Sequence, residues 1–378
     1  MNAPTFPNDT DEDKNITPIF DVLMNQYHSA TLVIFGRLGL FDYIHHCTNT
    51  PENDGVTVDQ IATYAKWSVR ATSAMLISLV TSGILEATVR ENTLSNLSTH
   101  SFEHTYRLTQ RAAKFLLSDA PGNMVPYLEL FWECSPQLLL EKAAANKQQD
   151  NFMLETGDGA PSDMFINAMQ GQTSHAAMVL APLLAEELSV AATNGSELGS
   201  ASENLEHFVD VGGGSGALCH ELCNVMPHWK GSIYELDGVC PIAEKFIQEA
   251  ELSDRVKAVP GNMFNDKTFP RASCYGFGNV LHDWSDDVNR MLLQKAFDSL
   301  PETGGKVLIV EMLVSEDVGS TSKVAAGLNL VMVTNEDGRQ YKASEIKIML
   351  ENIGFVDIKV ITSSITPYSA VLASKEIK

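Results

Sequence analysis

Basic residues, paired cysteines and long apolar runs are all scarce in this chain. Lysine and arginine number 26 against 48 aspartates and glutamates, which gives a formal net charge of −22. Because a nucleic-acid site needs cations to displace the counterions of phosphates, this deficit argues against DNA or RNA as a partner, and an anionic membrane surface would be repelled as well. None of the six cysteines forms a C-x-x-C pair. We therefore expect reduced thiols in a cytoplasmic protein and no metal knuckle.

Apolar residues are distributed in short stretches. No run approaches the roughly 18 residues of a membrane span, and residues 1–15 are polar and acidic. We expect neither a membrane segment nor a signal peptide. The 378 residues are 44% hydrophobic, which is enough for real cores and matches two domains of ordinary size.

The first half of the chain has a mainly helical pattern, divided by polar stretches at about 143–162 and 191–206. Apolar residues recur at helical spacing over 19–40, 58–65, 68–82, 124–147 and 164–187, with short strands at 84–86 and 106–108. Two helices followed by a two-stranded wing outline a winged helix. The second helix, 68–82, carries one charge, so we predict packing or dimerisation by this domain at 17–115 rather than DNA binding. A helical bridge at 116–190 is predicted to line a substrate pocket.

From 204 to 378 short apolar runs alternate with helical segments. The strand candidates are 207–211, 232–236, 256–259, 273–280, 306–312, 356–361 and 369–373, with helices between them such as 288–299 and 344–352. This alternation predicts an α/β fold with a Rossmann-like seven-stranded sheet, whose ligands bind at the carboxyl ends of the strands.

The first of these strands leads into D-V-G-G-G-S-G at 210–216. Glycines at 212, 214 and 216 allow a tight turn and a close approach to a ligand, and the helix that follows presents free amides. The spacing G-x-G-x-G after an acid differs from the dinucleotide pattern G-x-G-x-x-G. It resembles the first motif of class I S-adenosylmethionine-dependent methyltransferases. A glycine turn required only for packing is the alternative.

Three later motifs make the resemblance specific: G-N-M-F at 261–264, L-H-D-W-S-D-D at 281–287 and G-R-Q-Y at 338–341. With them the chain is similar to small-molecule O-methyltransferases of the caffeate and acetylserotonin type, in the bacterial-like branch. The similarity covers the C-terminal half, and the winged-helix dimerisation domain of that family fits residues from about 17 to 110. The resemblance implies a homodimer that uses S-adenosylmethionine and no metal.

The resemblance also implies which residues hold the cofactor. Its methionine end would lie on the glycine turn, its ribose on the acid that ends the second strand, and its adenine against the third-strand loop and a tryptophan. The implied set is Asp210, Gly212, Gly214, Glu235, Leu236, Asn262, Met263, Asn279 and Trp284. Asn262 replaces an acid of the family, and Gly278 and Asn279 stand where plant members have a lysine.

His282 is the predicted catalytic base. Displacement at a sulfonium carbon already has a good leaving group, so a hydroxyl acceptor needs a base of near-neutral pKa to become nucleophilic. Glu311 ends the next strand and can orient the imidazole. Gln340 takes the place of a second acid in the family pattern. The alternative is a histidine that only caps a strand end.

Acceptor contacts are predicted from the helical bridge and from residues after Glu311. The candidates are Tyr127, Phe131, Trp132, Met169, Gln172, His175, Asn329 and Met332. Core packing explains the methionines and aromatics as well. Tyr27, His28 or Arg37 of the dimerising helix could reach the pocket of a partner.

Three other functions stay open at this point. The same branch resembles methylthiohydroxybutyrate S-methyltransferases of dimethylsulfoniopropionate synthesis, in which Arg37 or Arg339 would anchor the carboxylate of a thioether acid. Some similar proteins keep the cofactor but act as pericyclases or decarboxylases. A winged-helix DNA-binding regulator is the non-enzymatic alternative, disfavoured by the net charge.

Overall fold

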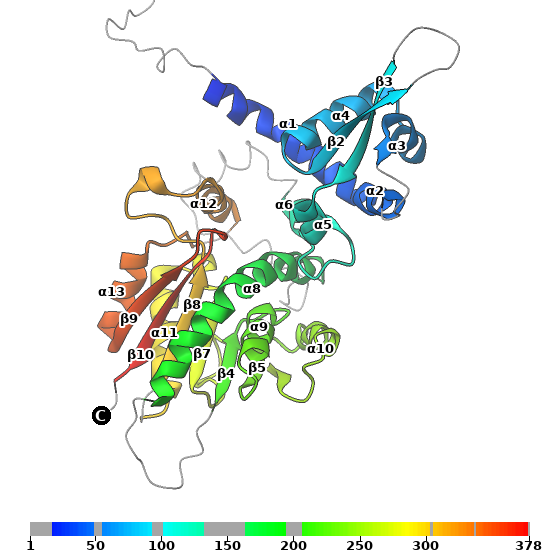
Figure 1. The fold of residues 1–378 in the computed structure, drawn as a ribbon. Helices are drawn as coiled ribbons and strands as arrows, with labels where there is room; N and C mark the ends of the chain where they lie inside the picture. Colours follow the sequence, from blue (N-terminus) through cyan, green and yellow to red (C-terminus); the bar gives the residue numbers. More distant parts are fainter. Residues whose placement is uncertain are drawn as a thin grey trace, which may run out of the picture. The chain divides into compact units, whose positions relative to one another are not determined.

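The structure is a computed structural model, which describes residues 17–48, 55–92, 101–131, 163–193, 206–302, 305–335 and 338–376. The chain divides into two compact units, Met1–Trp132 and Glu133–Lys378. Figure 1 labels the helices and strands of both. No helix within the described ranges is both long and apolar enough to cross a bilayer.

The first unit is helical with a small antiparallel sheet of order β1-β3-β2. Its elements are α1 (Thr17–Arg37), α2 (Leu40–Thr48), β1 (Val56–Thr57), α3 (Val58–Ala65), α4 (Val69–Thr81), β2 (Leu85–Asn92), β3 (Ser101–Leu108), α5 (Gln110–Leu116) and α6 (Val125–Phe131). Thr57 and Ser68 are the N-caps of α3 and α4. Their side-chain oxygens accept hydrogen bonds from first-turn amides that otherwise have no partner in the helix.

Two helices and a hairpin therefore occur where the sequence predicts them. The strands are longer than predicted, since β2 and β3 pair over eight residues each. The helix predicted over 124–147 begins as α6, and residues 132–147 lie outside the described part of the chain. The predicted division into 17–115, 116–190 and 204–378 stays a prediction.

The second unit contains a seven-stranded sheet of order β6-β5-β4-β7-β8-β10-β9. Its strands are β4 (His207–Val211), β5 (Lys230–Glu235), β6 (Val256–Pro260), β7 (Cys274–Gly278), β8 (Lys306–Glu311), β9 (Phe355–Thr362) and β10 (Ser369–Lys375). The first five run parallel, and β10 pairs antiparallel to both β8 and β9. The chain winds outward from β4 in both directions, so the switch of direction falls between β4 and β7.

Helices cover both faces of this sheet. They are α8 (Asp163–Thr193), α9 (Ala217–Val225), α10 (Cys240–Glu249), α11 (Asp286–Ser299), α12 (Lys323–Asn335) and α13 (Ala343–Ile353). Alternate strand residues serve separate cores: Phe208 and Leu308 pack with α8, α9, α10 and α12, while Val209 and Ile309 pack with α11 and α13. The result is a three-layer α/β unit, as predicted.

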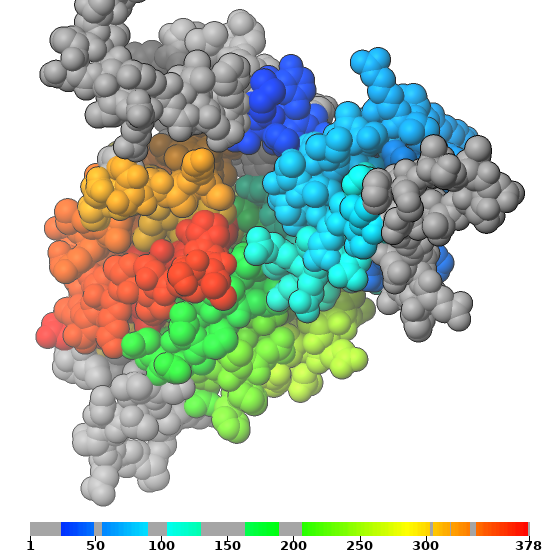
Figure 2. Space-filling model, turned by 45° about the horizontal axis from the view of Figure 1, so that its top comes forward, coloured from blue at the N-terminus to red at the C-terminus, as the bar shows by residue number. Residues whose placement is uncertain are grey.

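One surface of this unit combines elements that are distant in the sequence. Helix α13, the β9–β10 pair and α8 follow one another across it, in orange, red and green (Figure 2). The carboxyl ends of β4, β5, β6, β7 and β8 carry the motifs and acids that the sequence singles out, and the candidate site is built there.

Candidate active site

The glycine turn after β4 has a backbone that only glycine adopts readily. Gly212, Gly214 and Gly216 have φ values of +65°, +55° and +85°. A Cβ on Gly216 would lie 2.1 Å from Ile233 Cδ1, and one on Gly213 would lie 2.8 Å from Asp210 Cγ. Helix α9 begins directly after Gly216. The turn thus brings the amino end of a helix to the edge of the sheet, where its free amides can meet an anionic group.

One buried and one partly buried carboxylate flank this turn, and neither has a cationic partner among the described residues. Asp210 is 1% exposed and accepts one hydrogen bond, from the Cys219 amide at 3.2 Å. Burial, with a smaller contribution from Glu235, raises the pKa of Asp210 to about 7. Burial likewise raises the pKa of Glu235 to about 7, although Glu235 accepts the Leu236 amide at 3.0 Å.

These residues fit S-adenosylmethionine. A buried carboxylate is costly unless donors satisfy it, and the amino and hydroxyl groups of that cofactor are the donors these two acids lack. The predicted residues Gly212 and Met263 lie together, because a Cβ on Gly212 would be 3.6 Å from Met263 Sδ and 3.4 Å from a Val280 methyl group. Among the described residues no cluster of three metal-ligating side chains occurs.

The loop predicted to receive the adenine is fixed from three sides. Asn262 Oδ1 accepts the amides of Phe264 at 2.9 Å and Asn265 at 3.1 Å, so its oxygen already stabilises the loop. Lys295 of α11 donates to the carbonyl oxygens of Met263 and Asp266, both at 2.6 Å. The Phe264 ring meets the Trp284 ring edge-on, with centroids 4.7 Å apart. The loop also carries Asp266 Oδ2, which accepts the Tyr234 hydroxyl at 2.5 Å.

His282 lies on a single 3-10 turn, Leu281–Asp283, between the carboxyl ends of β7 and β8. Its Nδ1 is 2.5 Å from Glu311 Oε2. The other carboxylate oxygen, Oε1, accepts the backbone amides of Val280, Leu281 and His282 at 3.2, 2.9 and 3.4 Å. The Glu311 side chain therefore holds both the turn and the imidazole ring. Nε2 is the ring nitrogen that Glu311 does not contact.

Asp283 also faces the imidazole. Its Oδ1 is 3.2 Å from His282 Nε2, and both ring nitrogens thus have a carboxylate neighbour. Burial lowers the pKa of His282, but Glu311 and Asp283 outweigh it, and the pKa is raised well above its ordinary value. A base with a raised pKa is a stronger proton acceptor once it is neutral.

The loop that contains Gln340 runs past this histidine. A Cβ on Gly338 would lie 2.0 Å from the His282 carbonyl oxygen, so the two backbones touch. The Gln340 amide N–H donates to Asn329 Oδ1 at 2.9 Å, which brings two predicted residues together. The Gln340 carboxamide is buried, and within the described part of the chain neither its oxygen nor its nitrogen has a hydrogen-bond partner.

Helix α8 turns one face to the glycine turn and the end of β7. A Cβ on Gly214 would be 3.8 Å from Ile166 Cδ1, and Asn279 Nδ2 donates to Thr173 Oγ1 at 3.1 Å. Residues seven apart share a face at about 3.6 residues per turn. Met169 borders this face, whereas Gln172 and His175 lie around the helix from it, and their acceptor contacts stay a prediction.

The remaining predicted residues belong to other elements of the chain, and their acceptor contacts stay a prediction. Met332 is buried in a hydrophobic core. Tyr127 and Phe131 lie on α6 of the first unit, and Trp132 lies outside the described residues. On α1, His28 Nδ1 is 2.6 Å from Ser78 Oγ and Tyr27 is exposed.

The two arginines proposed as carboxylate anchors already face protein carboxylates. Arg37 lies 3.4 Å from Glu129, and Arg339 lies 2.9 Å from Glu345 and 3.5 Å from Asp286. Both guanidinium groups are partly exposed, and the thioether-acid alternative stays a prediction.

Sequence reasoning missed three residues that shape the site: Asp283, Lys295 and Thr173. Asp283 stands in the quoted motif beside His282, so its adjacency was the available signal. Thr173 lies on α8 between the predicted acceptor residues Gln172 and His175, so its neighbours were the available signal. No sequence pattern indicated Lys295, because its spacing is that of an ordinary exposed lysine on an amphipathic helix. Its contacts to the loop at Met263 and Asp266 exist only in the folded chain.

The doubly wound fold, the glycine turn with its unsatisfied acids and the carboxylate-held imidazole define a class I methyltransferase. Residues 142–356 match the family described as O-methyltransferase domain, and residues 20–118 match the O-methyltransferase dimerisation domain. The chain belongs to the O-methyltransferase family, as the motifs predict.

Characterised relatives include (R,S)-reticuline 7-O-methyltransferase of Papaver somniferum, with 31% identity over 72% of this chain and 74% of that protein. The 3-hydroxy-5-methyl-1-naphthoate 3-O-methyltransferase of Streptomyces sahachiroi is 32% identical over 42% of this chain and 45% of its own length. The acetylserotonin O-methyltransferase of Bos taurus is 33% identical over 44% and 47%. The chain thus spans about half the length of these last two relatives.

The fold has solved counterparts. Human N-acetylserotonin methyltransferase in complex with SAM matches with a TM-score of 0.71 and 20% identity, over 98% of this chain and 99% of that chain. CalO1, a methyltransferase in calicheamicin biosynthesis with SAH bound, matches with a TM-score of 0.68 and 18% identity, over 97% of this chain and all of that one. These matches confirm the predicted fold class.

Proposed function

We propose that this protein methylates a hydroxyl group of a small molecule, with His282 as general base and Glu311 as the residue that orients it. S-adenosylmethionine, when bound, supplies a methyl group on a sulfonium leaving group. Asp210 and Glu235 would accept hydrogen bonds from its amino and ribose hydroxyl groups. Asn262, Met263 and Trp284 would hold its base, and Gly212 and Gly214 its methionine end. We infer further that the chain acts as a homodimer through its dimerisation domain, residues 20–118.

The observation that carries the proposal is the contact between His282 Nδ1 and Glu311 Oε2 at 2.5 Å. A carboxylate accepts a hydrogen bond from Nδ1–H, so the lone pair of the neutral ring resides on Nε2. As the acceptor oxygen becomes a nucleophile, its proton moves to Nε2, and Glu311 stabilises the imidazolium that forms. Asp283 must turn away from Nε2 to admit the acceptor.

The relatives favour an aromatic hydroxyl acceptor. Two of them are named for a hydroxynaphthoate and for reticuline. The experiment offers a naphthol, a phenol, a hydroxyindole and a methylthio-hydroxy acid to the purified full chain with methyl-labelled cofactor. We expect label on at least one hydroxyl compound. Label on the thioether acid alone would contradict the proposal.

His282→Gln tests the base. General-base catalysis contributes about 10²–10⁴-fold, so kcat should fall by that factor while the affinity for S-adenosylhomocysteine, measured by calorimetry, stays unchanged. His207→Gln is the matched control, since His207 pairs with Ser232 at 2.8 Å near the amino end of β4. Equal activity of both variants would overturn the role of His282.

A further inference from the structure

The turn that carries His282 and Trp284 is held through its carbonyl groups as well as its amides. Glu311 accepts hydrogen bonds from the backbone amides of the turn, as described above. On the other side, Asn289 Nδ2 donates to the Leu281 carbonyl at 2.8 Å and to the Trp284 carbonyl at 3.1 Å. A turn of three residues has little cohesion of its own. Its shape therefore depends on these two side chains from different elements.

Tyr341 supports the orientation of the Asn289 carboxamide. The carbonyls of Leu281 and Trp284 can only accept, so the NH2 group of Asn289 faces the turn. The Tyr341 hydroxyl donates to Asp286 Oδ1 at 2.9 Å, with a longer contact to the Trp284 carbonyl at 3.3 Å. Because an ionised carboxylate is the stronger acceptor, the hydroxyl proton goes to Asp286 and its oxygen accepts from Asn289 Nδ2 at 2.9 Å. The two NH2 protons are thus shared among three acceptors, and Asn289 Oδ1 has no partner among the described residues.

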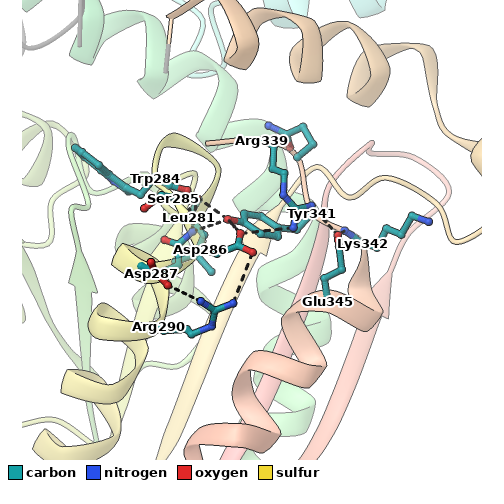
Figure 3. A network of polar contacts seen from close by, with 12 residues as sticks. Leu281, Trp284, Ser285, Asp286, Asp287, Arg290, Arg339, Tyr341, Lys342 and Glu345 are labelled. Atoms are coloured by element: carbon teal, nitrogen blue, oxygen red, sulfur yellow. Dashed lines mark hydrogen bonds and ion pairs between the residues drawn. The ribbon is translucent and has the colours of Figure 1, made fainter. Parts of the chain in front are cut away.

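The chain of contacts continues to the loop that passes His282 (Figure 3). Arg339 lies 3.5 Å from Asp286 Oδ1 and its guanidinium stacks over the Tyr341 ring at 4.3 Å. Glu345 binds the other side of Arg339 at 2.9 Å. Asn289 is fully buried and Tyr341 is 1% exposed, so water competes little for the hydrogen bond between these two residues.

We propose that Asn289 and Tyr341 are positioning residues, which fix the turn so that His282 faces the acceptor and Trp284 faces the cofactor base. This inference rests on the proposed function of His282. Neither residue touches the acceptor itself. Their effect is expected in kcat more than in cofactor affinity, because a small displacement of a base costs more in the transition state than in binding.

The test is Tyr341→Phe, which deletes only the hydroxyl. Tyr275→Phe is its matched control: Tyr275 is equally buried in the same unit, and its hydroxyl donates to the Pro270 carbonyl at 2.7 Å. Both variants should lose similar thermal stability. Tyr341→Phe alone should lower kcat, by about tenfold, and shift the rising limb of its pH profile. Equal kcat and pH profiles in the two variants would overturn the inference.

Two further measurements distinguish failure of this inference from failure of the proposed function. The imidazole signals of His282, followed by NMR with S-adenosylhomocysteine bound, should shift and titrate differently in Tyr341→Phe but not in Tyr275→Phe, whether or not the protein turns over an acceptor. Asn289→Ala should lower kcat as well, and in the double variant the two losses should not multiply, because the residues act through one contact. Unchanged His282 signals, or fully multiplicative losses, would contradict the inference.

Discussion

Glu311 holds His282 by two routes at once, because one carboxylate oxygen meets the ring at Nδ1 and the other accepts the backbone amide of the same residue at 3.4 Å. The ring cannot rotate without leaving Oε2, and the turn cannot unwind without leaving Oε1. The orientation of the imidazole is thus set before any ligand arrives, which lowers the cost of reaching a reactive arrangement.

Replacing Glu311 by glutamine should change the tautomer of His282. The glutamine oxygen can still accept the turn amides, but its NH2 group then faces Nδ1 and donates to it. The ring proton would move to Nε2, the nitrogen that must act as base. We expect kcat to fall by about 10²–10⁴-fold, as loss of an orienting carboxylate does elsewhere. Glu316→Gln is the control, because Glu316 also caps backbone, at the Ser344 amide, but lies outside the site. A normal kcat in Glu311→Gln would contradict the assignment.

Replacing Asp283 by asparagine should move the pH dependence of kcat. Burial lowers the pKa of His282, and the two neighbouring carboxylates raise it well above its ordinary value. A general base must be neutral, so activity should increase as pH rises through that pKa. Asp283→Asn removes one of the two raising charges, and the rising limb should shift to lower pH. A rate profile measured from pH 6 to pH 10 checks this direction, and a shift to higher pH would refute it.

Binding of the cofactor should release protons near neutral pH. Burial raises the pKa values of Asp210 and Glu235 to about 7 in the free protein. Ligand donors stabilise the carboxylate forms, so binding lowers both pKa values and protons leave. Affinity for S-adenosylhomocysteine should therefore fall as pH drops below 7. Calorimetry in two buffers of different ionisation enthalpy measures the release, and Asp210→Asn should reduce it. Proton uptake on binding would contradict this account.

The same acids should destabilise the free fold as pH rises. Their folded-state pKa values lie above the unfolded ones, so their contribution to stability is greatest below about pH 4 and is lost as pH rises through about 7. Asp210→Asn should thus raise the melting temperature of the free protein at pH 8 more than at pH 5, while it weakens cofactor binding. Thermal scans at both values decide it, and an equal change at the two would refute it.

Lys295→Met should weaken cofactor binding. Without the ammonium group, the carbonyls of Met263 and Asp266 lose the donor that holds the loop predicted to receive the adenine. We expect about a tenfold rise in the Kd of S-adenosylhomocysteine, equivalent to about 1.4 kcal/mol. Lys375→Met is a close control, since Lys375 also donates to two carbonyls, of Phe297 and Leu300, away from the site. Similar affinities in the two variants would show that the loop does not depend on Lys295.

Much of this protein could be predicted from local patterns. The strand and helix alternation after residue 206, the glycine turn and the place of His282 at a strand end follow from periods and turn residues, which act over a few positions. Asp210 and Glu235 were predictable because acids at the ends of adjacent parallel strands share one edge of a sheet. The predicted pocket residues stay predictions: Met332 is buried among other apolar side chains, and both arginines face acids.

The sequence by itself determined the elements and their order, since hydrophobic period and capping residues are local properties. Only the tertiary structure decided which side chains meet across the sheet edge. Lys295 reaching Met263, Thr173 reaching Asn279 and Tyr341 reaching Asn289 each join segments that are more than thirty residues apart. Such contacts depend on how helices pack onto the sheet, and packing is a property of the whole chain that no local pattern records.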